Sequence, residues 1–261
     1  MSNRCNGQIY VKKASGEIEL FSPEKLKESL IRSDANEEIV DQILDEICRW
    51  VISGTTTRKI YSKAFSLLRK KTISNAARYK LKNAIMELGP TGYPFEYFVG
   101  EIYKVLGYKT EVSRVIQGKY ITHEVDVIAT KDKHQRFIEC KYYQSSGKYA
   151  NVQVSLYIKS RVDDIISYRE ALPEYKEFTF SGGIVTNTRF TEDAEKFGIS
   201  SGLNLLSWNF PEGKGIKDII DKHSLFPITS LSSLSKADKQ KLLKKDVVIC
   251  KQILEDNQKL D

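Results

Sequence analysis

Two acidic residues and a lysine, Asp126, Glu139 and Lys141, lie in neighbouring β-prone segments at residues 120–130 and 136–143. Side chains alternate between the two faces of a strand, so Glu139 and Lys141 share a face. If the two segments pair, the three side chains can converge at one edge of a sheet. Buried charges without partners are costly, so we expect a cation or a charged substrate at this point.

Phosphodiester hydrolysis needs the groups that such a site offers. Mg²⁺ held by one or two carboxylates lowers the pKa of its bound water and neutralises the negative charge that develops. A lysine beside the metal can orient that water or stabilise the charge. The backbone carbonyl of Cys140 could fill another coordination position. The alternative, a hairpin with solvated Glu139 and Lys141, leaves unexplained the apolar residues that alternate with them.

The elements around these residues follow the order helix, three strands, helix, strand, helix, strand. Helices are expected at 95–106, 152–172 and 191–197, and strands at 110–116, 120–130, 136–143, 178–186 and 203–208. This order predicts an α/β (α+β) fold with a mixed central sheet flanked by helices. The helix after the third strand is expected to cross over right-handedly to a parallel strand.

The pattern resembles the PD-(D/E)xK nuclease superfamily, and within it the Mrr-like restriction endonucleases. In that family an acidic residue ends one strand and (D/E)-x-K follows on the next. The matching residues here are Asp126, Glu139, Cys140 and Lys141. Val125 occupies the place of the family's proline. Residues 183–187, with Phe190, Thr191 and Ala194, also resemble the Mrr-type continuation.

The resemblance implies a restriction-endonuclease-like fold and a Mg²⁺ (or Mn²⁺) ion. Its ligands would be Asp126, Glu139, the Cys140 carbonyl and an acidic residue of the preceding helix, namely Glu96 rather than Glu101. Lys141 would assist the attacking water. Gln144 resembles a glutamine found near the site in some members, and it joins the catalytic candidates Asp126, Glu139, Lys141 and Glu96. His123 is expected to have a minor role at most.

The N-terminal part of the chain predicts a β-hairpin followed by a helical bundle. Strands are expected at 8–12 and 17–21 with a turn at 14–16, and helices at 37–52, 58–70 and 75–88 after a first helix that opens at Pro23 with Ser22 as its N-cap. Two prolines and two glycines at 89–94 cannot continue a helix. The expected domains are therefore 1–88, a linker at 89–94, a nuclease domain at 95–214 and a helical C-terminal extension at 215–261.

Residues 9–88 resemble an ATP-cone, a nucleotide-binding regulatory domain. The resemblance rests on residues 11–21 and 23–26, with later matches at 57–61 and 76–79. It implies ATP or dATP as an allosteric ligand, contacted by Lys13, Glu19, Ser22, Lys25, Leu26, Thr57 and Tyr61. The family usually has arginine where Ala14 stands, which weakens the expected phosphate binding. The alternative is a helical domain with solvated lysines, used for oligomerisation or DNA contact.

Composition favours an anionic partner. The chain of 261 residues has a formal net charge of +7, which suits nucleic acid but also suits simple solubility. Its four cysteines are too far apart for a CxxC pair, so we expect reduced thiols in a cytoplasmic protein. No apolar run is long enough for a membrane span, so no membrane partner is expected.

These observations predict a Mg²⁺-dependent endonuclease acting on DNA, expected to be double-stranded, in restriction or phage defence. ATP or dATP would regulate it, and the protein would form a homo-oligomer. Two alternatives stay open: a catalytically silent DNA- or junction-binding protein, and a regulator in which nucleotide binding controls assembly.

Overall fold

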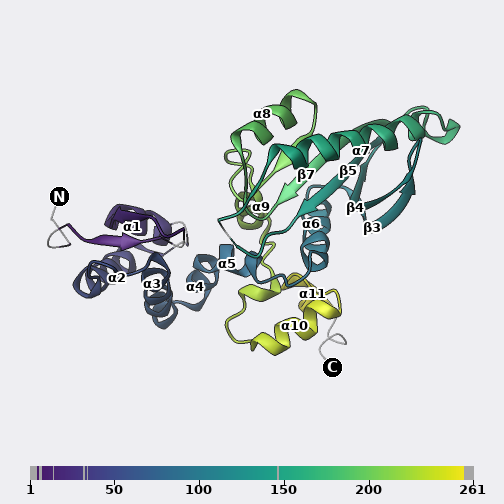
Figure 1. Ribbon diagram of the computed structural model, residues 1–261. Coiled ribbons are helices and arrows are strands. Elements are labelled where there is room, and N and C mark those ends of the chain that lie inside the picture. Colours follow the sequence, from purple (N-terminus) through teal and green to yellow (C-terminus); the bar gives the residue numbers. More distant parts are fainter. Residues whose placement is uncertain are drawn as a thin grey trace. The chain divides into compact units, whose positions relative to one another are not determined.

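The structure is a computed structural model, and it describes residues 5, 8–13, 15–31, 33, 35–145 and 147–255. The chain divides into two compact units, Met1–Leu81 and Lys82–Asp261. Figure 1 shows the first in purple to blue and the second in blue to yellow. The boundary between the units falls after Leu81, whereas the prolines and glycines of the expected linker lie at 89–94. The expected helix at 75–88 is interrupted at Lys80, which separates α4 (Ile73–Tyr79) from α5 (Leu81–Met86).

The N-terminal unit contains the expected hairpin and helices. Strand β1 (Tyr10–Lys12) pairs antiparallel with β2 (Ile18–Leu20), and α1 (Pro23–Ile31), α2 (Glu37–Trp50), α3 (Thr57–Lys71) and α4 follow. Ser22 Oγ accepts from the Lys25 backbone N–H at 3.2 Å, which confirms its N-cap role. Thr56 caps α3, and its side chain accepts from the Lys59 backbone N–H. Of the expected turn at 14–16, Ala14 lies outside the described residues.

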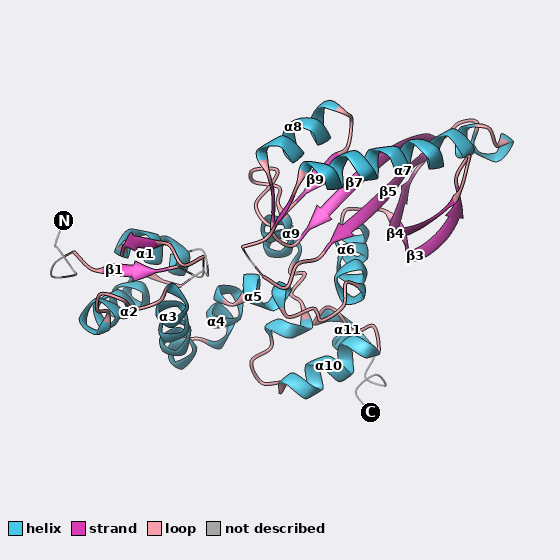
Figure 2. Ribbon diagram, viewed as in Figure 1, coloured by secondary structure: helices cyan, strands magenta, loops and turns pink. Residues whose placement is uncertain are grey.

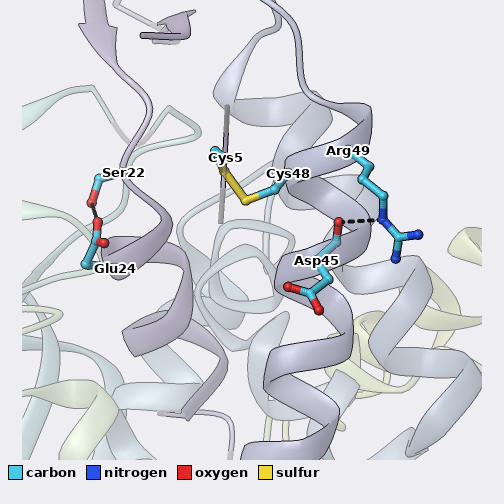
Figure 3. Close-up of a disulfide and its surroundings, with 6 residues drawn as sticks. All are labelled: Cys5, Ser22, Glu24, Asp45, Cys48 and Arg49. Atoms are coloured by element: carbon cyan, nitrogen blue, oxygen red, sulfur yellow. Dashed lines mark hydrogen bonds between the residues drawn. A yellow bond between two sulfur atoms is a disulfide. The ribbon is translucent and has the colours of Figure 1, made fainter. Parts of the chain in front are cut away.

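The expectation that all four cysteines are reduced is wrong. Cys5 and Cys48 form a disulfide, with their Cα atoms 4.9 Å apart, and it ties residue 5 to α2 (Figure 3). Cys140 and Cys250 are free. The two bonded cysteines are 43 residues apart in sequence. Their proximity depends on how α2 packs, which spacing alone does not reveal.

A five-stranded mixed sheet forms the centre of the second unit, in the order β3-β4-β5-β7-β9. Its strands are β3 (Lys109–Gln117), β4 (Thr122–Lys131), β5 (His134–Lys141), β7 (Thr179–Thr186) and β9 (Asn204–Leu206). The first three pair antiparallel, and β7 and β9 continue the sheet in parallel. This arrangement confirms the predicted mixed sheet.

Helices cover both faces of this sheet (Figure 2). Helix α6 (Tyr93–Val105) packs against β3, β4 and β5, and it ends before Gly107, whose φ of +89° favours glycine. Helix α7 (Val152–Glu170) connects β5 to β7 and buries Ile158, Val162 and Ile165 against Val125 and Phe137. Helix α8 (Glu192–Ser200) connects β7 to β9. The apolar side chains of these helices therefore form the core against which the strands pack.

Short elements complete this unit. They are β6 (Tyr149–Ala150), which pairs in parallel with β8 (Arg189–Phe190), the 3-10 helices η1 (Pro173–Tyr175) and η2 (Ile228–Ser230), and α9 (Ile216–His223), α10 (Lys236–Lys244) and α11 (Lys251–Glu255). Thr229 Oγ1 donates to the Ala84 carbonyl at 2.6 Å, and Gln240 Nε2 donates to the Gly89 carbonyl at 3.0 Å. These two hydrogen bonds connect the C-terminal extension to the segment that precedes α6. Across the described residues, each helix is too short or too polar to cross a bilayer.

Candidate active site

The expected site lies where β4 and β5 stop pairing. Their ladder ends at Val127 and Ile138, so Asp126 and Glu139 are the next residues on the two strands. On the other side of β4, the pairing with β3 skips Ser113, which stands opposite Asp126 and has a φ of +52°. A non-glycine residue in the left-handed region interrupts a regular ladder. The sheet therefore loses its regular hydrogen bonding on both sides of Asp126.

Asp126 reaches across the gap to β5. Its Oδ2 accepts the Cys140 backbone N–H at 2.6 Å. Burial, followed by repulsion from Glu139, raises the pKa of Asp126 to about 6. The hydrogen bond fixes this carboxylate beside the strand that carries Glu139 and Lys141. The structure therefore brings Asp126, Glu139 and Lys141 together, as the sequence predicts.

Glu139 is held by two cations. Its Oε1 accepts from Lys141 Nζ at 2.5 Å, and its Oε2 accepts from Arg161 Nη1 at 2.7 Å. The Glu139 side chain is 11% exposed, so both ion pairs are partly shielded from water. The backbone of Lys141 is also anchored, because its carbonyl accepts from the buried Thr186 Oγ1 at 2.8 Å. These contacts restrict how far Glu139 and Lys141 can move.

Arg161 is the residue that the sequence interpretation missed. It lies on α7, and its Nη2 also donates to the Glu124 carbonyl (Figure 1 shows α7 along the sheet). A signal was present, because Arg161 sits three residues after Ile158 on the buried face of an expected helix. A charged side chain on such a face needs a charged partner.

Glu96 lies in the first turn of α6, near the other acids. Burial, then the negative charges of Asp126, Glu124 and Glu139, raise its pKa to about 7. It is thus electrostatically coupled to the site. However, among the residues that the structure describes, no three acidic, histidine or cysteine side chains form a group that could hold a metal. Glu96 is therefore near Asp126 and Glu139 without completing a three-residue ligand set.

The remaining candidates occupy different environments. Gln144 is exposed, and its Nε2 donates to the Pro90 carbonyl at 2.9 Å, which ties the loop after β5 to the segment before α6. Glu101 pairs with Lys104 of the same helix at 2.6 Å. His123 is buried and hydrogen-bonds Asp164 Oδ2 at 2.7 Å. The Cys140 side chain is half-buried, and burial raises the pKa of its thiol, so the backbone carbonyl is the more suitable ligand.

Comparison with known proteins identifies the domain that holds this site. Residues 89–209 match the family model described as restriction endonuclease, of the Mrr catalytic type. Residues 89–209 are therefore similar to restriction endonuclease domains. Residues 226–261 match a second model, described as AF1548-like, C-terminal. The C-terminal extension thus contains a segment that is similar to a second family, separate from the segment at 89–209.

Individual proteins are similar to part of this chain. An uncharacterized protein of Archaeoglobus fulgidus is 28% identical over 148 residues, which cover 57% of this chain and 79% of that protein. A solved protein of unknown function, AF1548, is 27% identical with a TM-score of 0.56, covering 65% of this chain and 87% of that one. A repair endonuclease from Pyrococcus abyssi is 21% identical over 45% of this chain and 46% of that one, but its TM-score of 0.30 is too low to support a conclusion.

The donor set of the endonuclease domain suits a hard divalent cation. Asp126 and Glu139 repel each other, and that repulsion contributes to the raised pKa of Asp126. A divalent cation between them would relieve it. Mg²⁺ is commonly bound by only one or two carboxylates, with waters and substrate phosphates filling the other positions. Two carboxylates and the Cys140 carbonyl therefore fit this ion chemically.

The residues expected to bind a nucleotide lie in the N-terminal unit, and the structure gathers some of them. Lys13 Nζ and Lys25 Nζ lie 3.0 Å and 3.6 Å from Glu19 Oε2. Ser22 Oγ donates to Glu24 Oε2 at 3.1 Å (Figure 3).

The other three lie elsewhere in that unit. Leu26 is buried in its core, and Thr57 begins α3. Tyr61 stacks on Tyr79, with ring centroids 4.9 Å apart. Lys13, Glu19 and Lys25 therefore form one cluster, whereas Leu26 and Tyr61 pack within the bundle.

Proposed function

We propose that this protein is a Mg²⁺-dependent DNA endonuclease whose catalytic residues are Asp126, Glu139 and Lys141. The observation that carries the proposal is the carboxylate of Asp126 hydrogen-bonded to Cys140 of β5, next to Glu139 and its lysine. The match of residues 89–209 to a restriction endonuclease model supports hydrolysis of DNA as the reaction class. The net charge of +7 supports an anionic substrate.

Each residue has a distinct role in this proposal. Asp126, Glu139 and the Cys140 carbonyl would hold the ion, which would supply an activated water and neutralise charge on the phosphate. Lys141 lies beside Glu139, where its ammonium group can orient the attacking water or stabilise the oxyanion. Glu96, with a pKa of about 7, is placed to accept a proton at neutral pH.

Plasmid cleavage tests the proposal. Supercoiled DNA is incubated with the protein and Mg²⁺, Mn²⁺ or EDTA, and nicked and linear products are quantified. We expect cleavage with either metal and none with EDTA. Lys133→Ala serves as the control variant, because Lys133 pairs with the exposed Glu177 near the turn between β4 and β5. Absence of cleavage with both metals overturns the proposal.

One observation favours a second candidate, a silent DNA- or junction-binding protein. Both carboxylate oxygens of Glu139 are already paired with cations, Lys141 and Arg161. Such pairs can stabilise a fold without any metal. Binding of duplex or junction DNA without cleavage in the plasmid assay would support this candidate.

We further infer that the N-terminal unit binds ATP or dATP and thereby regulates cleavage and assembly into a homo-oligomer. Lys13 and Lys25 both lie close to Glu19, Lys13 also pairs with Glu17 at 3.1 Å, and the Lys25 side chain is 74% exposed. Such lysines suit a polyphosphate.

Titration calorimetry with ATP and dATP tests the regulatory site. We expect Lys13→Ala and Lys25→Ala to weaken binding at least about tenfold, and the exposed Lys70→Ala of α3 to leave it unchanged. Light scattering with and without nucleotide reports assembly. Absence of heat, of a mass change and of an effect on cleavage would exclude regulation while leaving the nuclease proposal intact.

A further inference from the structure

An open pocket of about 480 Å³ lies beside the candidate active site. It is bounded by the turn that connects β3 to β4 and by the outer surface of α7. Its wall includes Tyr120 and Ile121 from the turn and Tyr157, Ser160 and Arg161 from the helix. Arg161 also binds Glu139, so the pocket and the catalytic carboxylates share one side chain. We call these five residues the stacking pocket.

The apolar side chains of the stacking pocket are unusually exposed. Tyr120, Ile121 and Tyr157 are 77%, 62% and 60% exposed. Single apolar residues on a surface are ordinary, but large ones gathered at one pocket mark a binding surface. Aromatic rings that face solvent next to an active site are suited to stack on a planar ligand.

The turn that presents Tyr120 is fixed in place. Asp164 of α7 accepts from the Tyr120 N–H at 3.0 Å through Oδ1, and its carbonyl accepts from Lys119 N at 3.0 Å. Asp164 Oδ2 also bonds His123, and both side chains are nearly buried. A Cβ at Gly118 would lie 2.1 Å from this carboxylate, so the close approach requires glycine. The exposed ring is therefore held on a pre-organised turn, which lowers the entropic cost of binding.

The charges around the stacking pocket suit a nucleic acid. Arg161 lies 5.5 Å from the centre of the Tyr157 ring, and Lys119 lies 5.2 Å from the centre of the Tyr120 ring. The nearby Asp163 is paired with Lys159, and Asp164 is occupied by His123 and the turn. Aromatic faces bordered by cations are the features that proteins use to bind single-stranded DNA.

We propose that the stacking pocket binds an unpaired nucleotide of the DNA, with its base on Tyr120 or Tyr157 and a neighbouring phosphate near Arg161. A base in a regular duplex is covered on both faces, so it cannot stack on either ring. The preferred substrates are then DNA with unpaired nucleotides beside the cleavage position, such as a flap or a gap. This inference rests on the proposed nuclease function and names its substrate class.

Binding measurements on matched substrates test the inference. Fluorescence anisotropy in Ca²⁺, in place of Mg²⁺, compares a duplex carrying a single-stranded flap with the fully paired duplex. We expect Tyr120→Ala and Tyr157→Ala each to weaken flap binding about tenfold, the loss of one stacked base, with less than about twofold change for the duplex. Tyr120→Phe and Tyr157→Phe keep the aromatic face and retain binding.

Tyr149→Ala is the matched control, since Tyr149 is also exposed, at 46%, but lies on β6 outside the pocket. Equal losses on both substrates, or no loss on the flap, would overturn the inference. Binding of a protein partner instead of DNA at this surface would do the same. Cleavage assays on the two substrates separate the failures: a wild-type protein that cuts neither contradicts the nuclease function, whereas one that cuts both equally contradicts only the role of the pocket.

Discussion

Arg161 of α7 donates from Nη1 to Glu139 Oε2 of β5 at 2.7 Å, and so connects the helix that covers the sheet to the candidate catalytic strand. Its side chain is 17% exposed and that of Glu139 is 11% exposed. One residue thereby supports the core packing of α7, the orientation of Glu139 and the wall of the stacking pocket. Its removal affects all three.

Loss of Arg161 is expected to cost stability as well as activity. Arg161→Ala leaves Glu139 with Lys141 alone, and breaking a shielded pair costs about 2–4 kcal/mol of unfolding free energy. Denaturant unfolding measures the loss. The control is Lys159→Ala on the same helix, whose pair with Asp163 is more exposed and contributes less than about 1 kcal/mol.

A double-mutant cycle isolates the pair. Glu139→Ala with Arg161→Ala is expected to show a coupling of about 1–3 kcal/mol. Purely additive losses would mean that the ion pair contributes nothing and that Arg161 acts only through packing.

The pKa of Asp126 predicts a pH-dependent stability in metal-free protein. Folding raises this pKa from 3.8 to about 6, so the folded state binds more protons than the unfolded state within that window. The contribution of Asp126 to stability is therefore present at low pH and is lost as the pH rises towards about 6. Asp126→Asn, which can still accept from Cys140, removes this loss.

Calorimetric unfolding from about pH 4 to pH 8 tests this prediction. Relative to wild type, Asp126→Asn is expected to gain about 2–3 kcal/mol of stability across that range. Mg²⁺ is expected to raise the melting temperature of wild type and not of the variant. A stability difference that stays constant with pH would show that Asp126 titrates normally.

Lys239 is expected to matter for the C-terminal extension. It is 6% exposed, and its Nζ donates to the Thr229 carbonyl at 2.8 Å. Lys239→Ala loses this charged hydrogen bond and its packing, at a cost of about 2 kcal/mol. The exposed Lys241 on the same helix provides the control, with an expected change within about 0.5 kcal/mol. Equal effects of the two substitutions on thermal unfolding would contradict a structural role for Lys239.

The disulfide predicts the number of reactive thiols. Of the four cysteines, Cys140 and Cys250 are free. Denatured but unreduced protein is therefore expected to react with two equivalents of a thiol reagent, and reduced protein with four. Mass spectrometry of the labelled protein identifies the sites. Four reactive thiols without reductant would contradict the Cys5–Cys48 bond.

The sequence was most informative where the structure depends on local spacing. Alternation put Glu139 and Lys141 on one face and allowed Asp126 to converge with them if the strands paired, and Ser22 before Pro23 placed the start of α1. Contacts between distant elements were not accessible in this way. Arg161 approaches Glu139 only because α7 packs on the sheet, and Cys5 meets Cys48 only through the placement of α2. The single helix expected at 75–88 is divided at Lys80 into α4 and α5, a break that no proline or glycine in the segment announces.

The central claim concerns the chemistry of Asp126, Glu139 and Lys141, and single-turnover cleavage of labelled DNA tests it most directly. Wild type and the control Lys133→Ala are expected to cleave at the same rate in Mg²⁺. At equal DNA occupancy, the cleavage rates of Asp126→Ala and Lys141→Ala are expected to be about 100-fold to 1000-fold lower. Cleavage by either variant at the wild-type rate would contradict the assignment of this active site.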